Sequence, residues 1–204
     1  MSGLDAIRAA AQAELARTPR ARPWWVDALA LAGTNLGVGL VLMVVLTPHL
    51  EQHASEAFRQ LGTAGLLLVA GGGAFAAVRP GWRTVRWSMV ALAAGSTLVV
   101  LAAASGVGPV GPLFGGAGCG VLEGLYSLIP VLVSTFVLSR FAPDLLRSVV
   151  AGLSAGAGGL VGLHLHCPNG TLAHLVAFHL VPWVVVSAGA VGLRRLVGSA
   201  TWAP

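Results

Sequence analysis

The stretch "DLLRSVVAGLSAGAGGLVGLHLHCPNGTLAHLVAFHLVPWVVVSAGAVGL", residues 144–193, decides the fold, because it holds two apolar runs near 144–164 and 172–193. A hydrocarbon core about 30 Å thick needs roughly 20 apolar residues in a helix that rises about 1.5 Å per residue. Both runs have this length, and only the short connection 165–171 separates them. The stretch is therefore predicted to cross a membrane twice.

Four further apolar runs of this length precede the stretch, near 25–47, 58–78, 87–105 and 120–139. The 204-residue chain is 56% hydrophobic and 9% charged, with a mean hydropathy of +0.83, whereas soluble domains carry roughly 25% charged residues. We predict an all-α integral membrane protein, a bundle of six transmembrane helices in one membrane domain, residues 24–195. A cytoplasmic tail (1–23) precedes this domain and a short cytoplasmic C-terminus (196–204) follows it. The connections leave no room for a soluble catalytic domain.

The basic residues predict the orientation of the bundle. All twelve are arginines, and because cytoplasmic segments collect Arg and Lys, their positions mark the cytoplasmic side. Only Arg59 lies elsewhere, at the outer start of the span 58–78. The other eleven lie in the tail, the second and fourth connections and the C-terminal region: Arg8, Arg17, Arg20, Arg22, Arg79, Arg83, Arg86, Arg140, Arg147, Arg194 and Arg195. Both termini are therefore predicted to be cytoplasmic. The net charge of +5 reflects this topology and does not indicate direct nucleic acid binding, because no exposed domain offers a basic face.

This topology places both cysteines on the outer side of the membrane. The connection 106–119 ends in Cys119, and the connection 165–171 contains Cys167. The histidines gather in the same outer half of the molecule: His49, His53, His164, His166, His174 and His179.

Three interpretations of this outer cluster stay open. Histidines can sit at a membrane interface and cysteine can act as a small hydrophobe. An even number of cysteines outside the reducing cytosol permits a disulfide between Cys119 and Cys167. Thiolates and imidazoles are also ligands for zinc, copper and similar ions, although no CxxC or HExxH motif is present. The candidate metal ligands are Cys119, Cys167, His164, His166, His174 and Glu123.

Glu123 is a candidate because it lies four residues after Cys119, on the same helical face and one turn deeper. A carboxylate inside an apolar span is costly and marks a functional or structural polar contact, or a position close enough to the outer edge to reach interfacial water. Its expected partners are His174 and His166.

A serine hydrolase motif is discounted. The letters G-x-S-x-G surround Ser154, but a nucleophile elbow needs a turn from strand to helix. The small residues Gly152, Gly156 and Gly159 instead have the spacing that lets membrane helices approach closely. Pro130 and Pro182 near the middles of spans four and six are expected to bend those helices. We therefore expect no enzymatic activity.

The tail is predicted to form an amphipathic helix that ends before Pro19. Its apolar stripe consists of Leu4, Ile7, Ala11 and Leu15, at helical spacing. An isolated helix of this length is marginal in water. It would be stabilised on the inner membrane surface or in the groove of a cytoplasmic partner, and both interpretations stay open.

A family resemblance rests on these features together. The short tail, the six spans, Cys119 at the outer start of span four, and the "LHCP" block with His166, Cys167 and Pro168 resemble the bacterial membrane anti-sigma factors of the NrsF type. The general organisation is also similar to that of myxobacterial CarR-type proteins. The resemblance implies that the tail binds an extracytoplasmic-function sigma factor, through the helix around Leu4 to Leu15. It also implies that Cys119 and Cys167 sense an insult and that the sigma factor is then released.

The predicted function is therefore a membrane-bound anti-sigma factor in the bacterial inner membrane, responding to redox change, metal ions or light-generated oxidants. This mechanism requires no cofactor, and a transition-metal ion at the outer face is the one cofactor that the side chains suggest. The alternative is a metal- or cofactor-handling transporter or oxidoreductase that uses the outer His/Cys/Glu cluster. A transporter is expected to carry paired polar residues along a path through the membrane, whereas here the inner half offers few of them.

Overall fold

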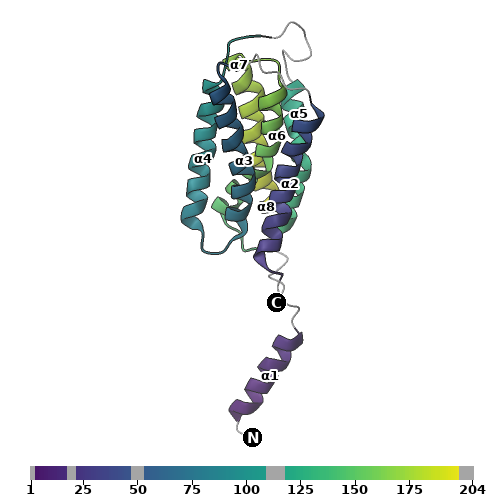
Figure 1. Cartoon of the computed structure of the whole chain (residues 1–204). Helices are drawn as coiled ribbons and strands as arrows, with labels where there is room; N and C mark the ends of the chain where they lie inside the picture. Colours follow the sequence, from purple (N-terminus) through teal and green to yellow (C-terminus); the bar gives the residue numbers. More distant parts are fainter. Residues whose placement is uncertain (1–2, 18–21, 47–52, 109–117, 198–204) are drawn as a thin grey trace.

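The computed structural model describes residues 3–17, 22–46, 53–108 and 118–197, and within the tail helix it describes side chains only up to residue 10. His49 and Glu51 of the first outer connection and most of the connection 106–119 lie outside the described residues. The described residues form an all-helical bundle in which six helical segments are long and apolar enough to cross a membrane (Figure 1). The predicted fold class, a bundle of six transmembrane helices, is confirmed, and the chain is a multi-pass membrane protein.

The bundle begins after the tail helix α1 (Gly3–Arg17). Its first five crossings are α2 (Trp24–Val45), α3 (Glu56–Val78), α4 (Arg83–Ala102), α5 (Gly118–Leu138) and α6 (Leu145–His166). The sixth crossing has three parts, α7 (Leu172–Leu175), the π-helical turn η1 (Val176–Leu180) and α8 (Val181–Leu196). The largest difference from the predicted bounds is in the third crossing, which begins at Arg83 and not at 87. The residues 83–86 extend that helix because Trp82 and Arg86 close its first turn with a backbone hydrogen bond of 3.0 Å.

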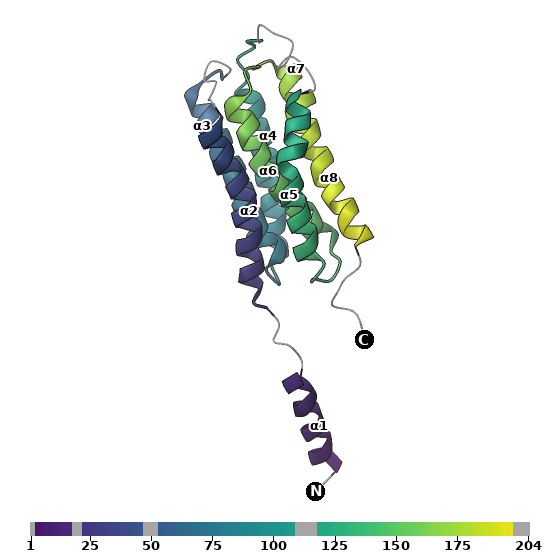
Figure 2. The same cartoon turned by 90° about the vertical axis from the view of Figure 1, so that its right-hand side faces the viewer.

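Helix α6 is the centre of the bundle. It packs against α2, α3, α4, α5 and α8, and 83% of its apolar part is buried, against 50% or less in the other crossings (Figures 1 and 2). Its glycines make this burial attainable. A methyl group on Gly158 would collide with the backbone carbonyl of Asn35 on α2, and one on Gly152 would lie 2.7 Å from the carbonyl oxygen of Ser187 on α8. The small-residue spacing of this span therefore serves close helix packing.

A buried polar contact joins three helices at the middle of the bundle. Ser154 Oγ of α6 donates to the carbonyl oxygen of Ala70 on α3 (2.6 Å) and accepts from Asn35 Nδ2 of α2 (2.7 Å). Because the hydroxyl already makes two interhelical bonds and is fully buried, Ser154 has a packing role and is not placed as a nucleophile.

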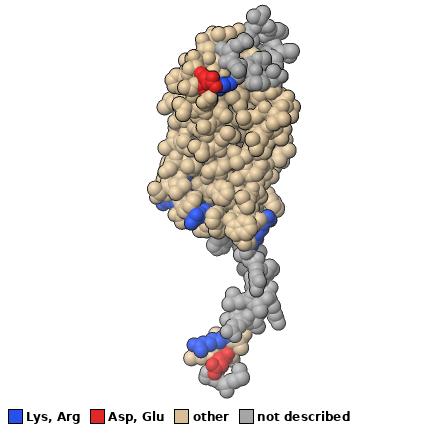
Figure 3. All heavy atoms as spheres, viewed as in Figure 1, with Lys and Arg blue, Asp and Glu red and all other residues tan. Residues whose placement is uncertain are grey.

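One end of the bundle carries most of the arginines, and we call it the arginine end. Figure 3 shows Arg side chains along this rim and an uncharged band between the two ends on the face in view. Arg86 is buried there and donates to the carbonyl oxygens of Ala76 (2.8 Å) and Arg79 (2.9 Å). Arg140 at the end of α5 pairs with the buried Asp27 at the start of α2 (3.2 Å). Helix α2 begins and helix α8 ends at this end (Figure 2).

The tail helix α1 presents the apolar residues that the sequence singled out. Leu4 and Ile7 are each 67% exposed. Ala11 and Leu15 lie within the helix, but their side chains are outside the described residues.

Candidate functional site

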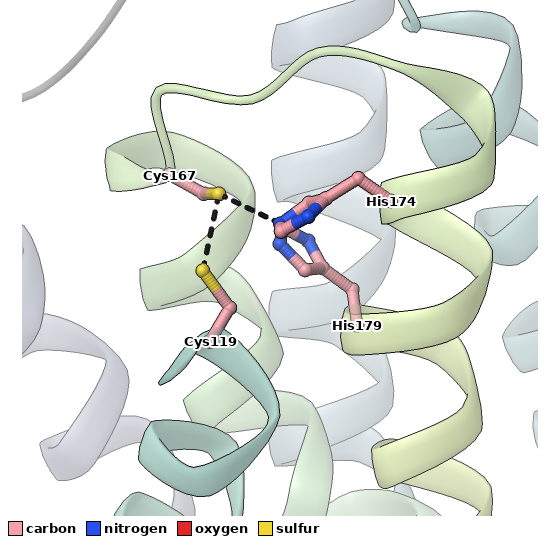
Figure 4. A group of neighbouring side chains, drawn as sticks. All are labelled: Cys119, Cys167, His174 and His179. Atoms are coloured by element: carbon pink, nitrogen blue, oxygen red, sulfur yellow. Dashed lines mark hydrogen bonds between the residues drawn. The ribbon is translucent and has the colours of Figure 1, made fainter. Parts of the chain in front are cut away.

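Four buried side chains meet at the other end of the bundle, and we call this group the Cys/His cluster (Figure 4). It consists of Cys119 in the first turn of α5, Cys167 at the end of α6, His174 in α7 and His179 in η1. None is more than 4% exposed. One sulfur or nitrogen atom from each lies within 4.8 Å of those of the other three. The cluster thus joins the fourth, fifth and sixth crossings.

The two cysteines are free thiols in direct contact. Cys119 Sγ and Cys167 Sγ lie 3.3 Å apart, and Cys167 Sγ lies 3.3 Å from His174 Nε2. The hydrogen bond to Cys119, together with burial, raises the pKa of the Cys167 thiol above its ordinary value. Cys167 therefore stays a neutral thiol near pH 7.

Proline fixes the position of Cys167. Residues that precede a proline disfavour the α conformation, and α6 accordingly ends at His166, with Cys167 extended (φ −76°, ψ 126°) before Pro168. The loop that follows is held down by two backbone bonds between Gly170 and the segment after α4, Gly106 N to Gly170 O (3.1 Å) and Gly170 N to Val107 O (2.8 Å). The thiol is therefore set at the end of a rigid, buried helix and not on a free loop.

The π-helical turn brings the two histidines together. In a regular α-helix, five residues span about 500°, so His174 and His179 would point about 140° apart. A π-turn bonds residue i to residue i+5 and so stacks positions five apart. With η1 between them, the ring centroids of His174 and His179 lie 5.2 Å apart, edge to face. Figure 4 shows both rings directed toward Cys167.

Pro182 explains the position of the π-turn. Proline lacks an N–H and its ring collides with the carbonyl four residues earlier, which here belongs to Phe178. The helix widens at this point into η1. On the neighbouring α5, a methyl group on Gly120 would lie 3.1 Å from Pro182 Cγ and 3.7 Å from the Phe178 oxygen. Glycine beside Cys119 thus lets α5 approach the widened turn.

The structure brings together three of the six predicted metal ligands, Cys119, Cys167 and His174, and adds His179. His164 lies outside the Cys/His cluster. Its ring packs edge-on against His53 at 4.8 Å, and its Nε2 lies 3.3 Å from the carbonyl oxygen of Arg59.

His166 and Glu123 also lie outside the Cys/His cluster. His166 lines a groove of about 520 Å³ between α2, α3 and α6. Glu123 is fully buried one turn below Cys119, where Ser127 Oγ donates to it at 3.3 Å and Gly159 packs against its carboxyl group. Neither predicted contact, with His174 or with His166, is among its hydrogen bonds in the described part of the chain.

His179 is absent from the predicted ligands, and a regular helical period would point it away from His174. The available signal was Pro182, three residues later, which disturbs that period and changes which face His179 occupies.

The Cys/His cluster supports two kinds of chemistry. Two thiolates and two imidazoles are the donor set of structural zinc sites, and two thiols in contact can be oxidised to a disulfide. Both involve the same two sulfur atoms.

Fold and site together define the class of this protein: a six-crossing helical membrane protein with a buried Cys/His cluster at one end and arginines at the other. Over 210 aligned residues the chain is 32% identical to the carotenogenesis protein CarR of Myxococcus xanthus, and the match covers 100% of this chain and 91% of that protein. The chain belongs to the CarR family. No protein-family model matches it, and no solved structure matches it. The resemblance to CarR-type organisation is confirmed, while the resemblance to the NrsF type stays a prediction.

Proposed function

We propose that this protein is an anti-sigma factor of the bacterial inner membrane, which binds an extracytoplasmic-function sigma factor through α1 and has no catalytic activity. The observation that carries the proposal is the match, over the whole of this chain, to the carotenogenesis protein CarR. In the described part of the chain, α1 lies outside the bundle and exposes apolar residues. With the arginine end on the cytoplasmic side, α1 lies where a sigma factor can reach it.

Exposed apolar residues on α1 support its role in binding. Leu4 and Ile7 lie one turn apart and are each 67% exposed. Burying a leucine or isoleucine side chain contributes about 1.5 to 3 kcal/mol. Two such side chains in a partner groove are therefore enough to change the affinity of a short helix by several orders of magnitude.

A chain of contacts connects the Cys/His cluster to the tail. Cys119 lies in the first turn of α5, and Arg140, two residues past the other end of this helix, pairs with Asp27 of α2 (3.2 Å). Asp27 also lies 3.9 Å from Arg22, at the end of the tail. A stimulus that moves α5 against α2 would therefore disturb the point where the tail enters the membrane. A tenfold change in sigma affinity needs a coupling free energy of only about 1.4 kcal/mol.

The stimulus in this proposal acts on the Cys/His cluster as an oxidant, including one generated by light, or as a metal ion. Either would change the bonding of Cys119 and Cys167, which now lie 3.3 Å apart, and so the packing of the crossings that carry them. Such a change must favour one of two arrangements of the bundle that differ in affinity for the sigma factor.

The test is co-purification of a sigma factor from membranes of the native host. The variant Leu4→Asp/Ile7→Asp is compared with Ala6→Asp/Ala9→Asp, which adds the same charge to the opposite face of the same helix. We expect the first pair to abolish recovery of the sigma factor and the control pair to retain it. Equal recovery with both variants, or no sigma factor with the unmodified protein, would contradict the proposal.

The second candidate function is metal handling by a transporter or an oxidoreductase, and the four-ligand cluster is the observation that favours it. The cavity beside Cys167 and His179 has a volume of only about 10 Å³, roughly the room that a single water molecule needs. An enzyme requires space for a substrate, and a transporter a path, so this closed geometry favours sensing.

A further inference from the structure

In the described part of the chain, the Cys/His cluster contains buried ring nitrogens that have no hydrogen-bond partner. His179 is fully buried, and neither of its ring nitrogens has a hydrogen-bond partner within the described part of the chain. Nδ1 of the buried His174 also has no hydrogen-bond partner among the described residues. Buried polar atoms without partners are costly, and those that persist in a native site call for an explanation such as a bound ion.

We propose that Cys119, Cys167, His174 and His179 form a closed, tetrahedral binding site for one zinc-class divalent ion, and that oxidation of the two thiols to a disulfide expels this ion. The assignment deepens the proposed function, because it names the chemistry of the outer sensor. It does not depend on the identity of the cytoplasmic partner.

The geometry fits such an ion. Metal–sulfur bonds of about 2.3 Å and metal–nitrogen bonds of about 2.0 Å place the corners of a tetrahedron roughly 3.3 to 3.8 Å apart. The Cys119–Cys167 and Cys167–His174 separations are both 3.3 Å, and the most distant pair of ligand atoms in the cluster lies within 4.8 Å. Closing that pair to a tetrahedral edge requires a movement of only about 1 Å, which side-chain rotation can supply.

The donor set and its burial select the kind of ion. Two thiolates with two imidazoles favour zinc and similar borderline ions over magnesium or calcium, which prefer oxygen ligands. All four ligands come from the protein, and the adjoining cavity of about 10 Å³ leaves no room for a substrate. Four protein ligands without an open position are typical of structural zinc sites, in contrast to catalytic ones.

The ion would hold three crossings together, since its ligands lie on α5, at the end of α6 and on the α7–η1 segment. It would also give one of the two unpartnered ring nitrogens of His179 a partner, because each histidine directs one nitrogen to the metal. Binding deprotonates both thiols, so two protons leave when the ion enters.

Oxidation and metal binding exclude one another, because the disulfide uses the sulfur electron pairs that bind the ion. With hydrogen peroxide as the oxidant, the two metal-bound thiolates give up two electrons, the S–S bond forms and the O–O bond breaks. Two protons from solvent complete two water molecules, and the divalent ion leaves with its charge unchanged. The disulfide then joins α5 to the end of α6 only, and the histidines of the sixth crossing are released.

The test uses the full-length protein, reduced and purified in detergent micelles. Bound zinc is counted per chain, and Co²⁺ is added to the metal-free protein as a spectroscopic probe. We expect one ion per chain, with the visible bands of tetrahedral Co²⁺ and near-ultraviolet bands of thiolate-to-cobalt charge transfer. His179→Gln should lose stoichiometric binding. The matched control His164→Gln, which changes a buried histidine at the same end of the bundle, should keep it.

The proposal is overturned if the unmodified protein binds no more ion than the Cys119→Ser/Cys167→Ser variant, or if its cobalt spectrum lacks thiolate bands. A second measurement needs no variant and so avoids any loss of folding: the zinc-loaded protein is treated with hydrogen peroxide while disulfide and free zinc are counted. We expect one zinc ion released per disulfide formed. A disulfide that forms while the zinc ion stays bound would show that oxidation and metal binding do not exclude one another. Because these readouts follow the ion itself, failure of sigma binding leaves their result unaffected.

Discussion

Oxidation of the cysteine pair should stabilise the bundle against complete unfolding, and the size of the effect follows from the chain topology. Cys119 and Cys167 are 48 residues apart in sequence. A disulfide across a loop of this length lowers the conformational entropy of the unfolded chain enough to contribute about 4 kcal/mol at 25 °C. This is an upper limit, because helices that persist in detergent already restrict the loop.

The assay is thermal unfolding in micelles of the metal-free protein, reduced or oxidised with diamide. For a chain of this size roughly 2 to 4 °C of midpoint shift accompanies each kcal/mol, so the oxidised form should melt up to about 8 to 16 °C higher. The Cys119→Ser/Cys167→Ser variant is the control and should show no response to the oxidant. An oxidised protein that melts at the same temperature as the reduced protein, or lower, would show that the two thiols do not close without strain in the native bundle, and the reasoning would be wrong.

Three further predictions concern the helix contacts below the Cys/His cluster. Gly158→Ala forces a methyl group onto the Asn35 carbonyl and should lower the free energy of unfolding by about 1 to 3 kcal/mol. The control Gly124→Ala, whose methyl group meets open space, should leave this free energy unchanged or raise it by up to about 1 kcal/mol. Equal melting midpoints for the two variants would refute the close crossing of α2 and α6. Ser154→Ala removes the bonds to Ala70 and Asn35 and should cost about 1 to 2 kcal/mol in the same assay, without altering sigma factor recovery. Asp27→Asn weakens the contact with Arg140. We expect the sigma factor to stay bound to the reduced variant but to be released less on oxidation. Release equal to that of the unmodified protein in the co-purification assay would show that the Asp27–Arg140 contact does not couple the Cys/His cluster to the tail.

The sequence by itself determined the class and the number of crossings. Runs of about 20 apolar residues have few stable structures in a bilayer, because every backbone polar group must be satisfied within the segment. This constraint is local, so reading each run separately was sufficient. The end of α6 is set locally as well, by Pro168 through the conformation of the residue before it, but the apolar run alone placed this end at 164 and the helix continues to His166.

Part of the site also followed from the sequence. Topology alone put Cys119 and Cys167 at one end of the bundle, since each lies where a span meets a connection of the same side. The contact between the two sulfur atoms at 3.3 Å could not be predicted from topology, because it depends on which helices are neighbours in the bundle. Gly159 of α6 lets α5 and α6 pack closely, because a methyl group there would lie 2.9 Å from Glu123 Oε2 and 3.1 Å from Ser127 Oγ of α5.

Only the tertiary structure decided which histidines join the cysteines. Six histidines shared one predicted half of the molecule, and His164, His166 and His174 were predicted as ligands. Only His174 of these three joins the Cys/His cluster, and the π-turn before Pro182 rotates His179 into it as well. The physical reason is that helix periodicity fixes a side chain's direction only while the hydrogen-bonding pattern is regular. Where proline changes that pattern beside a closely packed neighbour, the packing of the two helices determines which side chains meet.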